Sequence, residues 1–115
     1  MLDDVNVMLV EDEVLIAMDL TDHLEEMGAT VVGPYVTLDD ALAAEGSADV
    51  AVLDVDLHGQ QVFPLADALL KRGVPFVFHT GRGDVGELRD RYGDVPVVPK
   101  PCLPDELAKT ITAVV

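Results

Sequence analysis

The chain has 115 residues, about the commonest size for one compact domain, and half of its residues are apolar while only 4% are aromatic. No apolar run reaches the roughly 18 residues that span a bilayer, and the N-terminus lacks the pattern of a secretory signal. Asp and Glu outnumber Lys and Arg by 22 to 7, and the resulting net charge of −15 argues against nucleic-acid binding. We expect one cytoplasmic domain over residues 1–115, with no output domain and no membrane partner.

The first part of the chain predicts two strand–helix units. Residues 5–10 form an apolar run rich in β-branched side chains, and the run stops abruptly at three acids, as a buried strand does at a polar rim. Apolar residues then recur at spacings of four and three over 16–27 before a glycine, which indicates an amphipathic helix. Residues 30–36 predict a second strand, and Thr37-Leu38-Asp39-Asp40 forms a capping box for a short helix that ends near Gly46.

The rest of the chain repeats this design. Strands are predicted at residues 50–53, 75–78 and 95–98, and helices at 64–73, 84–92 and 104–114. The strand at 50–53 again ends on acids, Asp54 and Asp56. Asp84-x-x-Glu87 can cap the helix at 84–92, whose apolar stripe is thin.

Five strand–helix units with strands apolar on both faces indicate an α/β fold, a parallel sheet covered by helices on each side. Ligands bind such sheets beyond the carboxyl ends of the strands, where the strand order reverses. Glu11 and Asp12 follow the first strand, Asp54 ends the third, Thr80 ends the fourth and Lys100 follows the fifth. We therefore expect one site to gather all of them.

The residue types in this group point to phosphoryl transfer. Carboxylates from two adjacent strand ends repel one another, so their convergence makes sense mainly around a hard divalent cation such as Mg²⁺. A Lys offers a compact charge for phosphate oxygens, and a Thr hydroxyl can donate to the same group. Together they describe transfer of a phosphoryl group to Asp54.

Four segments carry a family resemblance that covers essentially the whole chain. Leu9-Val10-Glu11-Asp12-Glu13, Val52-Leu53-Asp54-Val55-Asp56, His79-Thr80-Gly81 and Val98-Pro99-Lys100-Pro101 look like the signature segments of response-regulator receiver domains. The resemblance implies a doubly wound (βα)5, flavodoxin-like fold with strand order 2-1-3-4-5. Each motif alone is weak, but their order and their placement at strand ends make the set specific.

The resemblance also implies a role for each site residue. Asp54 is implied as phospho-acceptor, Thr80 as switch hydroxyl and Lys100 as phosphate partner. The implied Mg²⁺ ligands are Glu11, Asp12, Asp54 and the backbone carbonyl of Asp56. The family also implies a cis bond between Lys100 and Pro101.

The chain departs from the common receiver pattern in two places. Many receivers have Met-Pro and then Asp-Gly in the loop after the acceptor strand, which here is residues 56–64, so the conformation of this loop is left open. Many place an aromatic switch residue where this chain has Val97. Residues 75–81 resemble instead a receiver subgroup with Phe-Ala-Thr-Gly, many of whose members are stand-alone domains.

We expect a regulatory domain and not an enzyme, one that takes its phosphoryl group from a histidine kinase or a histidine phosphotransfer protein. The expected downstream partner is a protein that contacts residues 80–115, and the expected state is a monomer or weak dimer. One alternative is a haloacid-dehalogenase-like phosphatase, because Asp54-Val-Asp56 mimics its nucleophile and acid pair. Another is a pseudo-receiver that binds partners without being phosphorylated.

Several nearby residues have simpler interpretations. Asp56 and Arg82 carry opposite charges. We expect them to pair across the mouth of the site and so to slow the hydrolysis of a phosphoryl group on Asp54. His79 is interpreted as a packed or solvated neighbour of Thr80, and His58 carries no signal. The single Cys102 cannot form an intramolecular disulfide and is interpreted as consistent with a reducing compartment or as an apolar filler.

Overall fold

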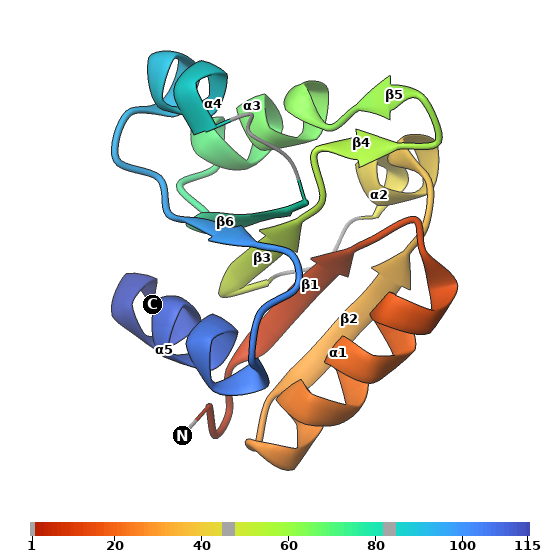
Figure 1. Cartoon of the computed structure of the whole chain (residues 1–115), viewed down its shortest axis with the longest axis vertical. Coiled ribbons are helices and arrows are strands. Elements are labelled where there is room, and N and C mark those ends of the chain that lie inside the picture. Colours follow the sequence, from red (N-terminus) through yellow and green to blue (C-terminus); the bar gives the residue numbers. More distant parts are fainter. Residues whose placement is uncertain (1, 45–47, 82–84) are drawn as a thin grey trace.

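The computed structural model describes residues 2–44, 48–81 and 85–115, and its centre is a five-stranded parallel sheet (Figure 1). The strands are β1 (Asn6–Val10), β2 (Thr30–Tyr35), β3 (Val50–Leu53), β6 (Phe76–Thr80) and β7 (Val97–Pro99). They lie in the order β2-β1-β3-β6-β7. Since β4 and β5 form a separate hairpin, this is the expected order 2-1-3-4-5. The fold class is confirmed.

Helices cover both faces of the sheet (Figure 1). Helices α1 (Val14–Glu26) and α5 (Pro104–Val114) lie on one face, and α2 (Leu38–Ala43), α3 (Phe63–Lys71) and α4 (Val85–Tyr92) lie on the other. Each face has its own hydrophobic cluster, because successive residues of a buried strand point to opposite sides. Along the described ranges, no helix combines the length and the apolar character that crossing a membrane requires.

The helix predictions hold with small corrections. The Thr37 hydroxyl accepts a hydrogen bond of 3.1 Å from the Asp40 backbone N–H, so the predicted cap of α2 is present. This helix ends at Ala43, where Ala44 turns to an extended conformation, and so is shorter than expected; Gly46 lies outside the described residues. The predicted cap Asp84 lies outside them as well. In α4 the buried residue is Leu88, which agrees with the thin apolar stripe.

An irregularity in β2 brings its end beside the residue that follows β1. The register between the two strands shifts between Met8 and Val10. Gly33 lies at this point with φ +104°, and a Cβ there would come within 3.0 Å of the Leu9 carbonyl oxygen. Only glycine fits this position without strain. As a result the Glu11 backbone N–H donates to the Tyr35 carbonyl at 3.0 Å, which extends the sheet into the site.

The loop after β3, whose conformation the sequence left open, is a small antiparallel hairpin. Its strands are β4 (Asp56–Leu57) and β5 (Gln60–Gln61). His58 and Gly59 form the turn with φ values of +52° and +85°. Two consecutive positive φ values are typical of a type I′ turn, which suits the twist of a two-residue hairpin.

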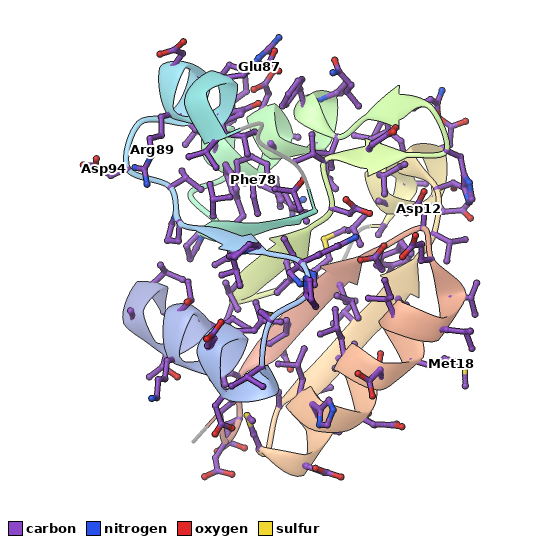
Figure 2. All side chains as sticks on the ribbon, in the orientation of Figure 1. Asp12, Met18, Phe78, Glu87, Arg89 and Asp94 are labelled. Carbon is purple, nitrogen blue, oxygen red and sulfur yellow. The ribbon has the colours of Figure 1, made fainter. Side chains whose placement is uncertain are left out.

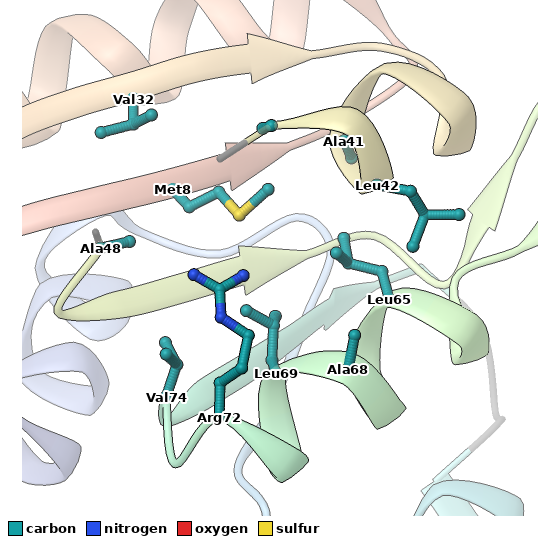
Figure 3. Close-up of a pocket in the computed structure, with 11 residues that line it drawn as sticks. Met8, Val32, Ala41, Leu42, Ala48, Leu65, Ala68, Leu69, Arg72 and Val74 are labelled. Atoms are coloured by element: carbon teal, nitrogen blue, oxygen red, sulfur yellow. The ribbon is translucent and has the colours of Figure 1, made fainter. Parts of the chain in front are cut away.

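The core between α2, α3 and the sheet is incompletely filled (Figure 3). A cavity of about 40 Å³ lies there, and its lining includes Met8, Ala41, Leu65, Ala68 and Leu69. Leucines of both helices line the cavity as well, and the short side chains of Ala41 in α2 and Ala68 in α3 contribute to the space.

Candidate functional site

Three carboxylates meet just beyond the carboxyl ends of β1 and β3. The Asp54 backbone N–H donates to the Val10 carbonyl at 2.9 Å, so Asp54 continues the pairing of the two strands by one residue. Glu11, Asp12 and Asp54 each offer an oxygen atom, and these oxygens all lie within 4.8 Å of one another. Glu11 and Asp54 are buried, and Asp12 is partly buried at the edge (Figure 2).

Lys100 brings the fifth strand to the same place. Its Nζ lies 2.8 Å from Glu11 Oε1 and donates a hydrogen bond of 3.0 Å to Asp54 Oδ2. Its backbone N–H donates to the Thr80 carbonyl at 2.8 Å, which fixes the end of β7 against the end of β6. The Lys100–Pro101 bond is cis, as predicted.

The electrostatics of this group disfavour a full set of ionised carboxylates. Burial and the neighbouring Glu11 raise the pKa of Asp54 to about 8, against an opposing effect of Lys100. Burial also acts to raise the pKa of Asp12, but hydrogen bonds with the Asp54 side chain and the His58 backbone N–H outweigh it and hold that pKa below its usual value of 3.8. One ammonium group therefore does not balance three carboxylates.

These residues fit a hard divalent cation. Glu11 is only 1% exposed, and its Oε1 accepts no hydrogen bond of acceptable angle among the described residues, although Lys100 is close. Lys100 is a single ammonium among three carboxylates, so a further cation would supply interactions that these buried oxygens still lack. Oxygen donors from several carboxylates are the ligands that Mg²⁺ takes in proteins.

Two other predicted site residues lie nearby, and one lies outside the described ranges. Thr80 is buried at the end of β6. The Asp56 side chain is exposed and accepts a hydrogen bond of 3.0 Å from the Gly59 backbone N–H, so it stabilises the hairpin turn and is not part of the carboxylate group. Arg82 is not among the described residues, and its expected pairing with Asp56 stays a prediction.

Two histidines without a predicted functional role border the site. The His58 backbone N–H donates to Asp12 Oδ2 at 3.1 Å, and its ring Nδ1 lies 3.8 Å from the same oxygen. His79 is buried, with Nδ1 at 4.0 Å from Glu11 Oε1. The alternation of side chains along the fourth strand could have placed residue 79 on the opposite face from Thr80. The turn that brings His58 inward had no comparable signal.

Several solved structures of bacterial proteins are similar to this chain. No family model and no curated protein matches this chain. Among solved structures, SdrG from Sphingomonas melonis Fr1 is 44% identical, with 95% of this chain and 94% of that chain covered and a TM-score of 0.81. The response regulator PhyR from Brucella abortus is 30% identical over 95% of this chain, with a TM-score of 0.80. The receiver domain of Erythrobacter litoralis PhyR is 26% identical, covers 96% and 89% of the two chains and gives a TM-score of 0.84.

The chain belongs to the response-regulator receiver domains. This receiver domain spans 46% of Brucella PhyR, so the match covers less than half of that protein. The haloacid-dehalogenase alternative is not favoured, because the Asp56 carboxylate accepts from the Gly59 N–H and is not in the carboxylate group of Asp54, and the two PhyR structures that match are a response regulator and a response-regulator receiver domain.

An aromatic cluster lies beside the switch position of this receiver domain. Val97 occupies the place where many receivers have an aromatic residue, and Tyr92 supplies a ring from α4. The centroid of the Tyr92 ring is 5.6 Å from that of Phe76 and 5.5 Å from that of Phe78.

The Tyr92 hydroxyl donates a hydrogen bond of 2.8 Å to Asp67 Oδ1 of α3. Burial and this carboxylate raise the pKa of Tyr92 to about 12. Tyr92 therefore ties α4 to both the core and α3.

Proposed function

We propose that this domain is the phospho-acceptor of a two-component system. Asp54 takes a phosphoryl group from a histidine kinase or histidine phosphotransfer protein, with Mg²⁺ as cofactor. The observation that carries the proposal is the contact of buried Asp54 with Lys100, next to the carboxylates of Glu11 and Asp12. An acceptor carboxylate, a phosphate-binding ammonium and a cation site are the parts that phosphoryl transfer to aspartate needs.

The residues divide the chemistry among them. An Asp54 oxygen forms the new O–P bond while the N–P bond of the donor's phosphohistidine breaks and its electron pair returns to the imidazole. Lys100 moves its contact from Asp54 to the phosphoryl oxygens, and the Thr80 hydroxyl donates to the same group. Mg²⁺, held by Glu11, Asp12, Asp54 and the backbone carbonyl of Asp56, would neutralise charge on the phosphoryl oxygens.

The surface around the site supports a protein donor. Val14, Leu15 and Met18 of α1 are 57%, 82% and 58% exposed, and Met18 projects away from the helix (Figure 2). Such apolar side chains beside a polar site are typical of a protein contact. We further propose a cytoplasmic receiver of the Phe-Ala-Thr-Gly-like subgroup, a monomer or weak dimer, without its own turnover of external substrates.

Intact-mass measurement tests the proposal directly. Incubation with a small phosphodonor and Mg²⁺ is expected to add the mass of one phosphoryl group, and Asp54→Asn is expected to remove the gain. Asp56→Asn is the matched control and is expected to keep it, because that carboxylate only stabilises the hairpin. A labile adduct that persists in Asp54→Asn would assign the nucleophile elsewhere, and no adduct in the wild type would favour a pseudo-receiver.

A turnover assay distinguishes a receiver from the haloacid-dehalogenase-like phosphatase. A receiver releases almost no phosphate in multiple turnovers with a generic phosphomonoester, whereas a phosphatase does. Steady turnover that depends on both Asp54 and Asp56 would support the haloacid-dehalogenase interpretation.

The response is expected on the face formed by residues 80–115, where a downstream protein would bind. Thr80 and Lys100 contact the phosphoryl group from that side, and both are followed by segments that lead into α4 and α5. Amide chemical shifts recorded with and without the phosphodonor should move there. Changes confined to α2 would contradict this.

A further inference from the structure

His79 is a buried histidine that lacks a strong hydrogen-bond partner. Its side chain is 5% exposed, and its Nδ1 has no partner among the described residues. Its Nε2 faces the sulfur of Cys102 at 3.5 Å, a contact that is weak as a hydrogen bond. A buried imidazole in this state is destabilising unless something else satisfies the ring nitrogens.

The contact between His79 and Cys102 has the dimensions of a pair of metal ligands. Zn–N and Zn–S bonds of about 2.0 and 2.3 Å at a tetrahedral angle place the two donor atoms about 3.5 Å apart. The measured separation of Nε2 and Sγ is 3.5 Å. Both residues line a pocket of about 360 Å³ between α1, β6 and the segment before α5. The pocket gives an ion and its water ligands room to enter.

The charges around this pocket favour a cation. Glu13 and Asp19 of α1 line the same pocket, and both are exposed; Asp19 Oδ1 also lies 3.3 Å from His23 Nε2, whereas Glu13 has no such contact with a histidine of the described residues. Burial and the nearby Glu106 raise the pKa of the Cys102 thiol, which disfavours the thiolate as long as no cation is bound beside it. Lys100 opposes a cation here, since together with burial it lowers the pKa of His79.

The far side of the ring resembles the outer shell of a metal site. A histidine that binds a metal through one nitrogen usually donates its other N–H to a carboxylate, which fixes the ring. Glu11 Oε1 lies 4.0 Å from His79 Nδ1, close enough for a small shift to make that hydrogen bond. Glu11 also belongs to the carboxylate group of the phosphorylation site.

We propose that His79 Nε2 and Cys102 Sγ bind a borderline-soft divalent metal ion of the Zn²⁺ class, at a site separate from that for Mg²⁺. A carboxylate of Glu13 or Asp19 and water complete the coordination. On binding, the Cys102 S–H bond releases its proton to solvent, and the thiolate and the neutral Nε2 each donate an electron pair without oxidation or reduction. The Nδ1–H then donates to Glu11, so occupancy of this site changes how Glu11 serves the other.

Cobalt(II) is a suitable probe because its thiolate complexes absorb in the near ultraviolet. Cys102 is the single cysteine, so any sulfur-to-cobalt band comes from it. We expect a saturable band of one Co²⁺ per chain that Zn²⁺ abolishes and Mg²⁺ leaves intact. Cys102→Ser should abolish the band, and His79→Ala should weaken Co²⁺ binding at least tenfold.

The controls use His58 and the wild-type thiol. His58→Ala should bind Co²⁺ as the wild type does, whereas His23 is unsuitable as a control because its Nε2 lies 3.3 Å from Asp19 Oδ1. In the unmodified protein, stoichiometric Zn²⁺ should slow the reaction of Cys102 with a thiol reagent, and Mg²⁺ should not. No band in the wild type, or equal Co²⁺ affinity in His79→Ala, would overturn the proposal. Neither result depends on whether Asp54 is phosphorylated.

Discussion

At the scale of single residues, the surroundings of Asp54 favour the protonated carboxyl group, whereas its proposed function needs the ionised one. Burial and the carboxylate of Glu11 favour its protonated form, with a pKa of about 8. Under the proposed function Asp54 must be ionised to act as a nucleophile, so at neutral pH a cation in addition to Lys100 would favour its attack on phosphorus. This requirement links cation binding to reactivity without any movement of the backbone.

The same property predicts a pH-dependent stability for Asp54→Asn. The folded pKa of about 8 lies above the ordinary value of 3.8, so between these values the folded protein keeps a proton that the unfolded chain releases. Asp54 therefore lowers stability progressively as pH rises from about 4 to about 8, whereas Asn does not titrate. In the presence of a chelator, the variant should be more stable than the wild type at pH 9 by at least about 1.4 kcal/mol, the equivalent of one pKa unit.

Thermal unfolding at pH 5, 7 and 9 measures this difference. The gap in Tm should be small at the lowest pH and largest at the highest, and saturating Mg²⁺ should narrow it by stabilising the wild type. A gap that is the same at all three pH values would mean that Asp54 does not carry the shifted pKa.

The position of Asp12 in the carboxylate group predicts that its removal weakens Mg²⁺ binding. Asp12→Ala removes a partly exposed carboxylate oxygen from the cation site, and Mg²⁺ affinity should fall about tenfold or more, equivalent to about 1.4 kcal/mol. Asp56→Ala is the matched control, because it removes an exposed carboxylate while keeping the backbone carbonyl. Calorimetric titration with Mg²⁺ should separate the two, and equal affinities would contradict the assignment of Asp12.

At the scale of elements, α4 is the helix with the weakest apolar attachment. Leu88 is its buried residue, and Tyr92 adds a ring against the phenylalanines and a hydrogen bond to Asp67. The helix follows Thr80 along the chain and is part of the proposed output face. Its position therefore depends on a few contacts that a change at Thr80 can shift.

Tyr92→Phe tests the polar part of that attachment. The variant keeps the ring but loses the hydroxyl that donates to Asp67, and should lower the free energy of unfolding by about 1 kcal/mol. A double-mutant cycle with Asp67→Ala, measured by denaturant unfolding, should give a coupling of similar size. Additive effects of the two substitutions would show that the hydrogen bond contributes nothing.

At the scale of the whole molecule, filling the cavity between α2, α3 and the sheet with a larger side chain should stabilise the protein. Ala68→Met adds a flexible apolar side chain to α3 at the cavity wall and should raise stability by about 1 kcal/mol. Ala113→Met on the exposed side of α5 is the control and should change stability by less than about 0.5 kcal/mol. A loss of stability in Ala68→Met would mean that the space is too small for the longer side chain.

The sequence predicts the sheet well because its strands are apolar on both faces and end abruptly on polar residues. That pattern placed Glu11, Asp54 and Lys100 at one edge, and the structure brings their charged groups within contact distance. The β4–β5 hairpin was not predicted. Its strands have two residues each, and its turn uses His58 at positive φ, where Asn-Gly is the recognisable signal.

The fifth strand and the buried histidine were harder to predict for different reasons. Strand β7 begins at Val97, two residues later than expected, since Pro96 has no N–H to pair with a neighbour. The surroundings of His79 depend on Cys102, which is 23 residues away and reaches it through the loop before α5. Spacing along the chain carries no information about such a contact.

The last two residues of β6, His79 and Thr80, connect the carboxylate site to opposite faces of the sheet. Adjacent residues of a strand face opposite sides of a sheet, so Thr80 shares the side of Phe78 and α4, while His79 shares the side of Val77, with Cys102 against its ring. Because His79 and Thr80 are neighbours in the chain, a change at the carboxylate site can reach both faces of the sheet through adjacent residues. A partner bound over α4 would sense Thr80, and a partner bound over α1 and α5 would sense His79 through Glu11 and Lys100. Under the proposed function, a phosphoryl group on Asp54 would in this way be sensed on both faces of the domain, by different proteins.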